Sequence, residues 1–336
     1  MPSRSADIKQ VKNSWEDYII PDNYWGITER REIALLNTNM EQPCTEFTAR
    51  VQTASDLFNE VRDRINKGIS VRKNLVWLEL TGCSGNIISL LNGKNPDFKY
   101  LISEMVNLVY DNSLMAAEGE KAMEQLISAK DKEYILAVEG AVATKNNGLY
   151  NIIGKLKGEP FTALKAIKLL GEKASHVIAV GACAVHGGPS ASKPNPAECV
   201  SVQSLLNRKV IKLPGCPCHP DWFLGTLAHI LLYGEPELDD RDRPLLFYST
   251  LIHDRCPRRS YFDRGIFASR LGENTCMFKI GCRGPVTPID CPIRKWNEYV
   301  NWPIGADTPC IGCAQFGFPD RMEPFITYNT TREVGK

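Results

Sequence analysis

Twelve cysteines restrict what this 336-residue chain can fold into more than any other feature. Six of them fall within residues 256–313, a stretch that is also rich in proline and glycine. Such a segment has little periodic apolar surface to bury, whereas a bound metal supplies folding free energy directly. Because cytoplasmic proteins rarely keep structural disulfides, the cysteine count predicts metal or redox chemistry.

Composition narrows the class of protein further. The chain is 43% hydrophobic and 24% charged, with a formal net charge of +1, which gives no electrostatic case for nucleic acid or an anionic membrane. No stretch approaches the roughly 18 apolar residues of a membrane-spanning helix. Residues 1–18 show no apolar signal core, and no apolar stretch follows Arg30-Arg31. We therefore expect a cytoplasmic protein with no nucleic-acid partner and no transmembrane anchor.

Strands and helices alternate through the middle of the chain. This alternation predicts the α/β class, with a mainly parallel, doubly wound sheet. An amphipathic helix over 53–68, with Leu57, Val61 and Ile65 on one face, is expected before it. The predicted strands are 74–80, 132–142, 175–184 and 209–216, and the predicted helices between and after them include 161–174 and 219–234.

Three cysteines follow three of these strands, each in a glycine-containing turn. Cys83 lies in TGCSG, Cys183 in VGACA and Cys216 in LPGCP. Ligand sites in open parallel sheets lie at the carboxyl ends of the strands, so these thiols are expected to converge. Thiolates are the usual ligands of iron–sulfur clusters, and glycine allows the close backbone approach that cluster sulfides need.

The cysteine-rich C-terminal stretch divides into two sets of candidate ligands. One set offers three thiolates and an imidazole, which could hold a four-iron cluster, and the other offers three thiolates, which fits a three-iron cluster. Zinc remains an alternative, because Cys-x-x-Cys occurs in both kinds of site. The first set is His253, Cys256, Cys276 and Cys282, and the second is Cys291, Cys310 and Cys313.

Seven segments together resemble the small subunits of nickel–iron hydrogenases, in the order that the family shows. The resemblance covers about residues 74–320. The segments are VEGAV (138–142), VGACAVHGGPSASKPNP (180–196), LPGCPCHPDW (213–222), HDRCPRRSYFDRG (253–265), CMFKIGCRGPVT (276–287), CP (291–292) and WPIGADTPCIGC (302–313).

The resemblance implies a flavodoxin-like domain at 73–238 and a loop-rich iron–sulfur domain at 239–336, after an N-terminal extension (1–72) of unknown role. It also implies a proximal, a medial 3Fe-4S and a distal 4Fe-4S cluster. Hydrogen would be oxidised at a nickel–iron centre in a partner large subunit, in a heterodimer or higher assembly, and this chain would pass the electrons to an unknown acceptor. The implied ligands are Cys83, Cys183 and Cys216 (proximal), Cys291, Cys310 and Cys313 (medial), and His253, Cys256, Cys276 and Cys282 (distal).

The chain departs from the family at the proximal site. The usual Glu-Cys-Thr-Gly-Cys reads Glu79-Leu80-Thr81-Gly82-Cys83, so one ligand is missing. The cluster is then a three-iron type, or is completed by an oxygen ligand such as Glu79 or a nearby aspartate, or is completed by Cys218. This departure resembles the cytoplasmic uptake-type group. Glu79 and Glu139, at strand ends near these cysteines, are candidates for a proton relay or for hydrogen-bond anchors.

Two other functions remain open within this scaffold. A hydrogen-sensing regulatory subunit would share these ligands but turn over slowly. A complex I-like electron-transfer subunit would share the GACA and LPGCP segments, although complex I relatives lack the C-terminal cysteine domain.

Overall fold

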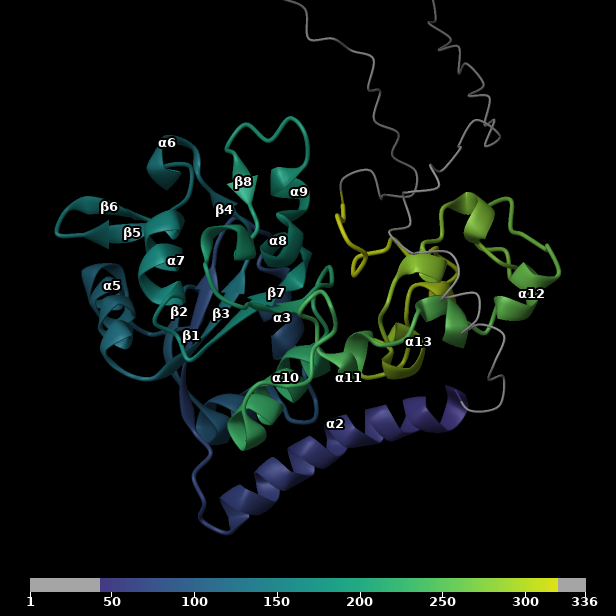
Figure 1. Cartoon of the computed structure of the whole chain (residues 1–336), viewed down its shortest axis with the longest axis horizontal. Helices are drawn as coiled ribbons and strands as arrows, with labels where there is room; N and C mark the ends of the chain where they lie inside the picture. Colours follow the sequence, from purple (N-terminus) through teal and green to yellow (C-terminus); the bar gives the residue numbers. More distant parts are fainter. Residues whose placement is uncertain (1–42, 320–336) are drawn as a thin grey trace, which may run out of the picture. The chain divides into compact units, whose positions relative to one another are not determined.

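The computed structural model describes residues 43–319, with side chains described from residue 54 onward (Figure 1). The first described helix is α2 (Pro43–Asn66), which covers the helix predicted at 53–68 except for its last two residues. Leu57 and Val61 are buried and Ile65 packs against the same core, as the apolar spacing predicted. The helix begins earlier than predicted, at a proline, the residue that best tolerates the first helical position.

A five-stranded parallel sheet forms the centre of the fold, with strand order β2-β1-β3-β7-β9. Renumbered by their order along the chain, these strands read 2-1-3-4-5, the flavodoxin-like arrangement, which confirms the predicted fold class. The strands are β1 (Lys73–Glu79), β2 (Val106–Asp111), β3 (Tyr134–Glu139), β7 (His176–Val180) and β9 (Ile211–Leu213).

Helices cover both faces of this sheet (Figure 1). Trp77 and Ile135 point into one hydrophobic cluster with residues of α2, α3 (Gly85–Leu91) and α10 (Pro220–Tyr233). Side chains at the alternate strand positions point into the other cluster, which includes residues of α5 (Gly119–Ser128) and α7 (Ala163–Gly171). The central strands β1, β3 and β7 are buried on both faces, as their near-continuous apolar runs predicted.

The strand predicted at 175–184 is too long at its carboxyl end. β7 ends at Val180, and α8 (Gly181–His186) begins at once. Gly181 has a φ of +83° and ends the extended conformation. Cys183 therefore lies in the first turn of a helix rather than in a strand-end turn.

Several elements had no predicted counterpart. β2, at the edge of the sheet, has the exposed polar residue Asn107 among its apolar residues and follows a π-helical turn, η2 (Leu101–Met105). A hairpin of β5 (Ile152–Leu156) and β6 (Glu159–Thr162) precedes α7. Shorter elements are α4 (Phe98–Tyr100), η3 (Ala129–Asp131), β4 (Val142–Ala143), α6 (Lys145–Gly148), α9 (Gly188–Ala191), β8 (Cys199–Val200) and η4 (Gln203–Leu205).

Beyond residue 238 the described chain contains only helices of three to five residues joined by loops, as predicted. Met277, Ile289 and Trp302 nevertheless belong to the same hydrophobic cluster as Trp77. The domain boundaries at 72 and 238 stay predictions. Among the described residues, no helix is both long and apolar enough to cross a membrane. The helices are α11 (Leu245–Tyr248), η5 (Ile252–Arg255), α12 (Arg259–Asp263), η6 (Phe278–Ile280), η7 (Gly284–Val286), α13 (Cys291–Arg294) and η8 (Ile304–Ala306).

Candidate metal centres

Three thiols gather at the carboxyl edge of the sheet. Cys83 follows β1, Cys183 lies in α8 directly after β7, and Cys216 follows β9. Burial raises the pKa of Cys183 to about 12, and negative charge on Cys216 and Cys83 raises it further. Burial also raises the pKa of Cys216, with a second contribution from Cys83. These mutual effects place the three thiols within electrostatic range of one another. Protein atoms surround much of Cys216, yet its outer part, like Cys83, is exposed to solvent.

Glycines lie close to these thiols, at positions where a larger side chain would collide with them or with the adjoining backbone. A Cβ atom at Gly188 would lie 2.4 Å from Cys183 Sγ, and one at Gly85 would lie 3.0 Å from Cys83 Sγ. At Gly140, whose φ is +92°, a Cβ would lie 2.9 Å from the backbone of Thr81, in the turn before Cys83. The cradle around the thiols is therefore shaped for a group that approaches the backbone closely.

The two candidates for the fourth proximal ligand differ in their surroundings. Cys218 is buried in the core, and its Sγ lies 3.5 Å from the carbonyl oxygen of its neighbour His219. Its backbone is fixed by two bonds, from its N–H to Asn86 Oδ1 (2.7 Å) and from Ser89 Oγ to its carbonyl (2.8 Å). Glu79 is also buried, but neither carboxylate oxygen has a hydrogen-bond partner among the described residues.

Two further carboxylates lie near Glu79. Glu139 accepts hydrogen bonds from the backbone N–H groups of Asn86 and Ile87, both at 2.9 Å, at the start of α3. Burial raises the pKa of Asp111 to about 6, although its Oδ1 accepts two backbone N–H bonds. Asp111 Oδ2, like both oxygens of Glu79, has no partner in the described part of the chain. Sequence reasoning missed Asp111 because it missed β2.

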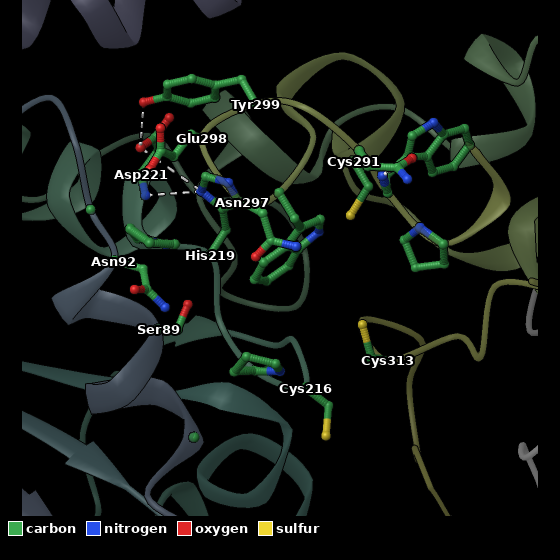
Figure 2. A pocket seen from close by; sticks show the side chains of 18 of the residues that line it. Ser89, Asn92, Cys216, His219, Asp221, Cys291, Asn297, Glu298, Tyr299 and Cys313 are labelled. Carbon is green, nitrogen blue, oxygen red and sulfur yellow. Dashed lines mark hydrogen bonds and ion pairs between the residues drawn. The ribbon is translucent and has the colours of Figure 1, made fainter. Parts of the chain in front are cut away.

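A second set of thiols lines a cavity of about 610 Å³. Figure 2 shows the sulfurs of Cys291 and Cys313 pointing toward a common space, whereas the sulfur of Cys216 points away from it; Cys216 and Cys310 also line the cavity. Burial raises the pKa of Cys313 to about 11 and raises those of Cys291 and Cys310 well above the ordinary value. The N–H of Gly312 donates to Cys310 Sγ (3.4 Å), a contact typical of cluster-binding loops.

The third set surrounds a separate, small cavity that His253, Cys256, Cys276 and Cys282 all line. Burial raises the pKa of Cys256, and charge on Cys282 and Cys276 raises it further, so these thiols are also close neighbours. The ring of His253 packs edge-on against Phe262, with centroids 4.5 Å apart. His253 and Cys256 are partly exposed, whereas Cys276 and Cys282 are buried.

A buried ion-pair network joins the first two sets. Arg294, at the end of α13, binds Asp290 (2.7 Å) and Asp221 of α10 (2.9 Å), and Asp290 also accepts from Trp222 Nε1 (2.7 Å). The residues that carry this network lie five or six positions after Cys216 and within three of Cys291. Nothing in the sequence marked the residues of α10 as partners of Asp290 and Arg294, because 68 or more positions separate them along the chain.

His219 lies beside this network and has both ring nitrogens bonded. Its Nδ1 accepts from the backbone N–H of Asp221 (3.0 Å), and its Nε2 lies 2.7 Å from the carbonyl oxygen of Lys295. The first bond requires an unprotonated Nδ1, so Nε2 carries the proton. Burial, assisted by the Arg294 charge, lowers the pKa of His219 to about 4. His219 is therefore a neutral structural residue.

The donor groups of the three sets suit iron–sulfur clusters. Each set offers three thiols, and the third set also offers an imidazole, and these are groups that ligate such clusters. Among the described residues, no group of three or more His, Cys, Asp or Glu side chains is placed to hold a single metal ion.

Comparison with known proteins decides the family. Residues 248–326 match the model for the C-terminal part of the NiFe/NiFeSe hydrogenase small subunit, and residues 83–230 match that of the NADH ubiquinone oxidoreductase 20 Kd subunit. The periplasmic [NiFe] hydrogenase small subunit of Solidesulfovibrio fructosivorans is 35% identical, over 83% of this chain and 90% of its own. This chain belongs to the nickel–iron hydrogenase small subunits. The uptake hydrogenase small subunit of Azotobacter vinelandii is 36% identical, over 79% of this chain and 75% of its own.

Solved structures agree with this hydrogenase assignment. The [NiFeSe] hydrogenase of Desulfomicrobium baculatum aligns with a TM-score of 0.72 at 35% identity, over 76% of this chain and 98% of that one. An actinobacterial-type NiFe hydrogenase from Ralstonia eutropha H16 gives the same TM-score at 26% identity, over 79% and 87%. This hydrogenase small subunit is thus the electron-transfer partner of a large subunit, in a family whose small subunits carry iron–sulfur clusters.

Proposed function

We propose that this small subunit holds three iron–sulfur clusters in the order proximal, medial, distal, and conducts electrons released by hydrogen oxidation. One observation carries the order: neighbouring cysteine sets are linked through adjacent ligands. Cys216 and Cys313 interact electrostatically and line one cavity. Cys310 and Cys282 interact likewise, and the Arg283 N–H beside Cys282 donates to the Cys310 carbonyl (2.8 Å). A continuous row of sites of this kind suits electron transfer.

The chain's own residues would set the position and surroundings of each cluster, while the clusters supply the electron-carrying chemistry. Cys291, Cys310 and Cys313 would hold a medial 3Fe-4S cluster. His253, Cys256, Cys276 and Cys282 would hold a distal 4Fe-4S cluster. The neutral imidazole of His253 in place of a thiolate lowers the negative charge of that site and shifts its potential upward.

The proximal site differs in that only three cysteines converge on it. We infer a three-iron cluster or a four-iron cluster completed by the carboxylate of Glu79. The unpartnered oxygens of Glu79 favour the second form, because a buried carboxylate without hydrogen bonds or a metal is costly. Cys218 is the weaker candidate because it is buried in the core. Its backbone N–H and its carbonyl oxygen are also both held by hydrogen bonds, to Asn86 and Ser89.

Glu79 is also the better candidate for proton transfer near the subunit interface. A relay group needs free oxygens to accept and release a proton, and those of Glu79 have no partner in the described chain. Both oxygens of Glu139 are occupied by backbone N–H groups, which suits an anchor for α3.

The decisive experiment is purification of the tagged chain from its own host with whatever accompanies it, followed by hydrogen-dependent viologen reduction. Rapid turnover with a nickel-containing large subunit supports the proposed enzyme. Slow turnover from an iron-loaded complex with a signalling partner would instead indicate the hydrogen sensor. A colourless, zinc-loaded chain would contradict both.

Location stays a prediction, and we propose the cytoplasm. Two relatives are named as periplasmic proteins, so family membership does not decide the compartment. Fractionation of host cells, with a cytoplasmic and a periplasmic marker enzyme as controls, tests it. Recovery of the chain with the periplasmic marker would contradict the proposal.

A further inference from the structure

Positive charge is concentrated around the third cysteine set. Residues 253–283 contain seven Arg and Lys but only three Asp and Glu, a net charge of +4 in a chain whose total is +1. Counting Asp307, which pairs with Arg258, the region still carries +3. The basic residues are Arg255, Arg258, Arg259, Arg264, Arg270, Lys279 and Arg283, and the acidic ones are Asp254, Asp263 and Glu273.

The acidic groups of this region are already engaged by its arginines. Arg259 binds Asp263 (2.9 Å) and lies 3.7 Å from Asp254, and Arg270 binds Glu273 (3.2 Å). Their negative charge is therefore offset locally. Arg264 and Lys279 are exposed and contact aromatic rings, Tyr261 and Phe267, rather than carboxylates.

An aromatic cluster lies between the basic residues and the imidazole. Phe262 contacts His253 and also packs edge-on against Phe278 (centroids 5.4 Å apart). Phe267 packs against both other phenylalanines and carries Lys279 on its face, 5.0 Å from the ring centroid. Phe278 is 43% exposed. The outer side of the site is thus an apolar centre beside a partly exposed imidazole, with cations around it.

We propose that this surface, which we call the distal face (His253, Phe262, Arg264, Phe278 and Lys279), docks an acidic one-electron carrier protein. A small apolar centre within a charged rim is the form of weak electron-transfer encounters, which bury less than about 1,200 Å². A net positive rim steers a negatively charged partner and raises its association rate. The inference rests on the proposed distal cluster, because a redox group must lie behind His253.

The test compares two soluble haem proteins of opposite charge as acceptors, the acidic domain of cytochrome b5 and basic cytochrome c. The purified complex is first reduced with dithionite, freed of excess reductant and mixed rapidly with each acceptor. This single-turnover reaction tests the distal face even if hydrogen gives no turnover. Hydrogen-dependent viologen reduction, measured separately, reports the proposed function.

Charge reversal identifies the surface that the carrier uses. The double variant Arg264→Glu, Lys279→Glu removes the excess positive charge without touching a proposed ligand. The control, Lys168→Glu with Lys173→Glu, makes the same change of charge at exposed positions at and after the carboxyl end of α7. Iron content shows whether each variant keeps its clusters.

At low ionic strength we expect the wild-type complex to reduce cytochrome b5 faster than the double variant does, by about tenfold or more. The difference should shrink as salt screens the charges, and the control should behave as the wild type. Equal cytochrome b5 rates in iron-replete wild type and double variant would overturn the proposal. The proposal would also be overturned if the rates with both haem proteins did not depend on salt while the complex rapidly reduced a soluble quinone. That result would indicate a quinone acceptor.

Discussion

Glu79 and Glu139 occupy paired positions on neighbouring parallel strands, yet only Glu139 has hydrogen-bond partners for its carboxylate among the described residues. Paired positions of parallel strands project to the same face, so the two carboxylates lie on one face at the carboxyl edge of the sheet, where the charge of Glu79 acts on Glu139. Their different environments predict different consequences of the same substitution.

Glu139→Gln should destabilise the protein without changing the clusters. An amide offers one acceptor oxygen where two backbone N–H groups need one each, which costs about 1–3 kcal/mol. Thermal unfolding of the purified complex measures the loss, and iron content and cluster spectra should match the wild type. A loss of iron equal to that of a ligand variant would contradict the anchoring role.

Glu79→Gln should leave the unfolding temperature nearly unchanged or raise it, because it removes a buried, unpartnered charge. Its effect should appear in function, either as a changed proximal electron paramagnetic resonance signal or as slower hydrogen turnover. The changed signal would indicate a ligand, and slower turnover with an unchanged signal would indicate a relay. Wild-type behaviour in both measurements would exclude both roles.

Cys216 and Cys218, two residues apart, offer a matched pair for the proximal site. We expect Cys216→Ala to lower the iron content and to abolish or alter the proximal signal. Cys218→Ala should keep the full iron content and lose about 1–2 kcal/mol of stability through the small cavity it leaves. Equal iron loss in both variants would make Cys218 a ligand after all.

Arg294→Met tests the buried ion-pair network. Removing the arginine leaves Asp221 and Asp290 buried without their cation, which costs about 3–5 kcal/mol. Chemical denaturation of the complex measures this loss, with Arg264→Met as a control at an exposed arginine. A loss below about 1 kcal/mol would mean that the network contributes little to holding α10 and α13 together.

His219 predicts an acid-sensitive fold. Its pKa falls from 6.5 to about 4 on folding, so the unfolded chain binds the proton more readily. Stability should therefore decrease as pH falls from about 6.5 toward 4, by roughly 3 kcal/mol for a shift of about 2.5 units. In His219→Asn, whose side chain can still accept the Asp221 N–H, this part of the pH dependence should disappear. An unchanged pH profile in the variant would assign the acid sensitivity to other groups.

Local sequence patterns were sufficient to predict the parallel sheet, the long N-terminal helix and the groups of cysteines. Apolar runs bounded by glycine mark strands buried on both faces, and β1 ends within one residue of its predicted end. The edge strand β2 was missed because the polar residue Asn107 interrupts its apolar residues, which leaves a run of only three, Leu108 to Tyr110. The end of β7 was misplaced because apolar GACA continues the strand pattern, and only the positive φ of Gly181 interrupts it.

The missed parts of the site share a physical cause. Asp111 depends on the missed strand, and the Arg294 network joins residues whose pairing is set by tertiary packing. A single sequence carries no signal for such pairs. The linkage of Cys310 to Cys282 likewise appears only in three dimensions, because the two cysteines are 28 positions apart along the chain.

That linkage has a consequence for biogenesis. One backbone hydrogen bond, from Arg283 to Cys310, belongs to the ligand loops of two different clusters. The conformation of each loop therefore constrains that of the other, and we expect insertion of one cluster to favour insertion of its neighbour. Under iron limitation, we expect most molecules to carry either both clusters of the C-terminal region or neither, and few to carry only one.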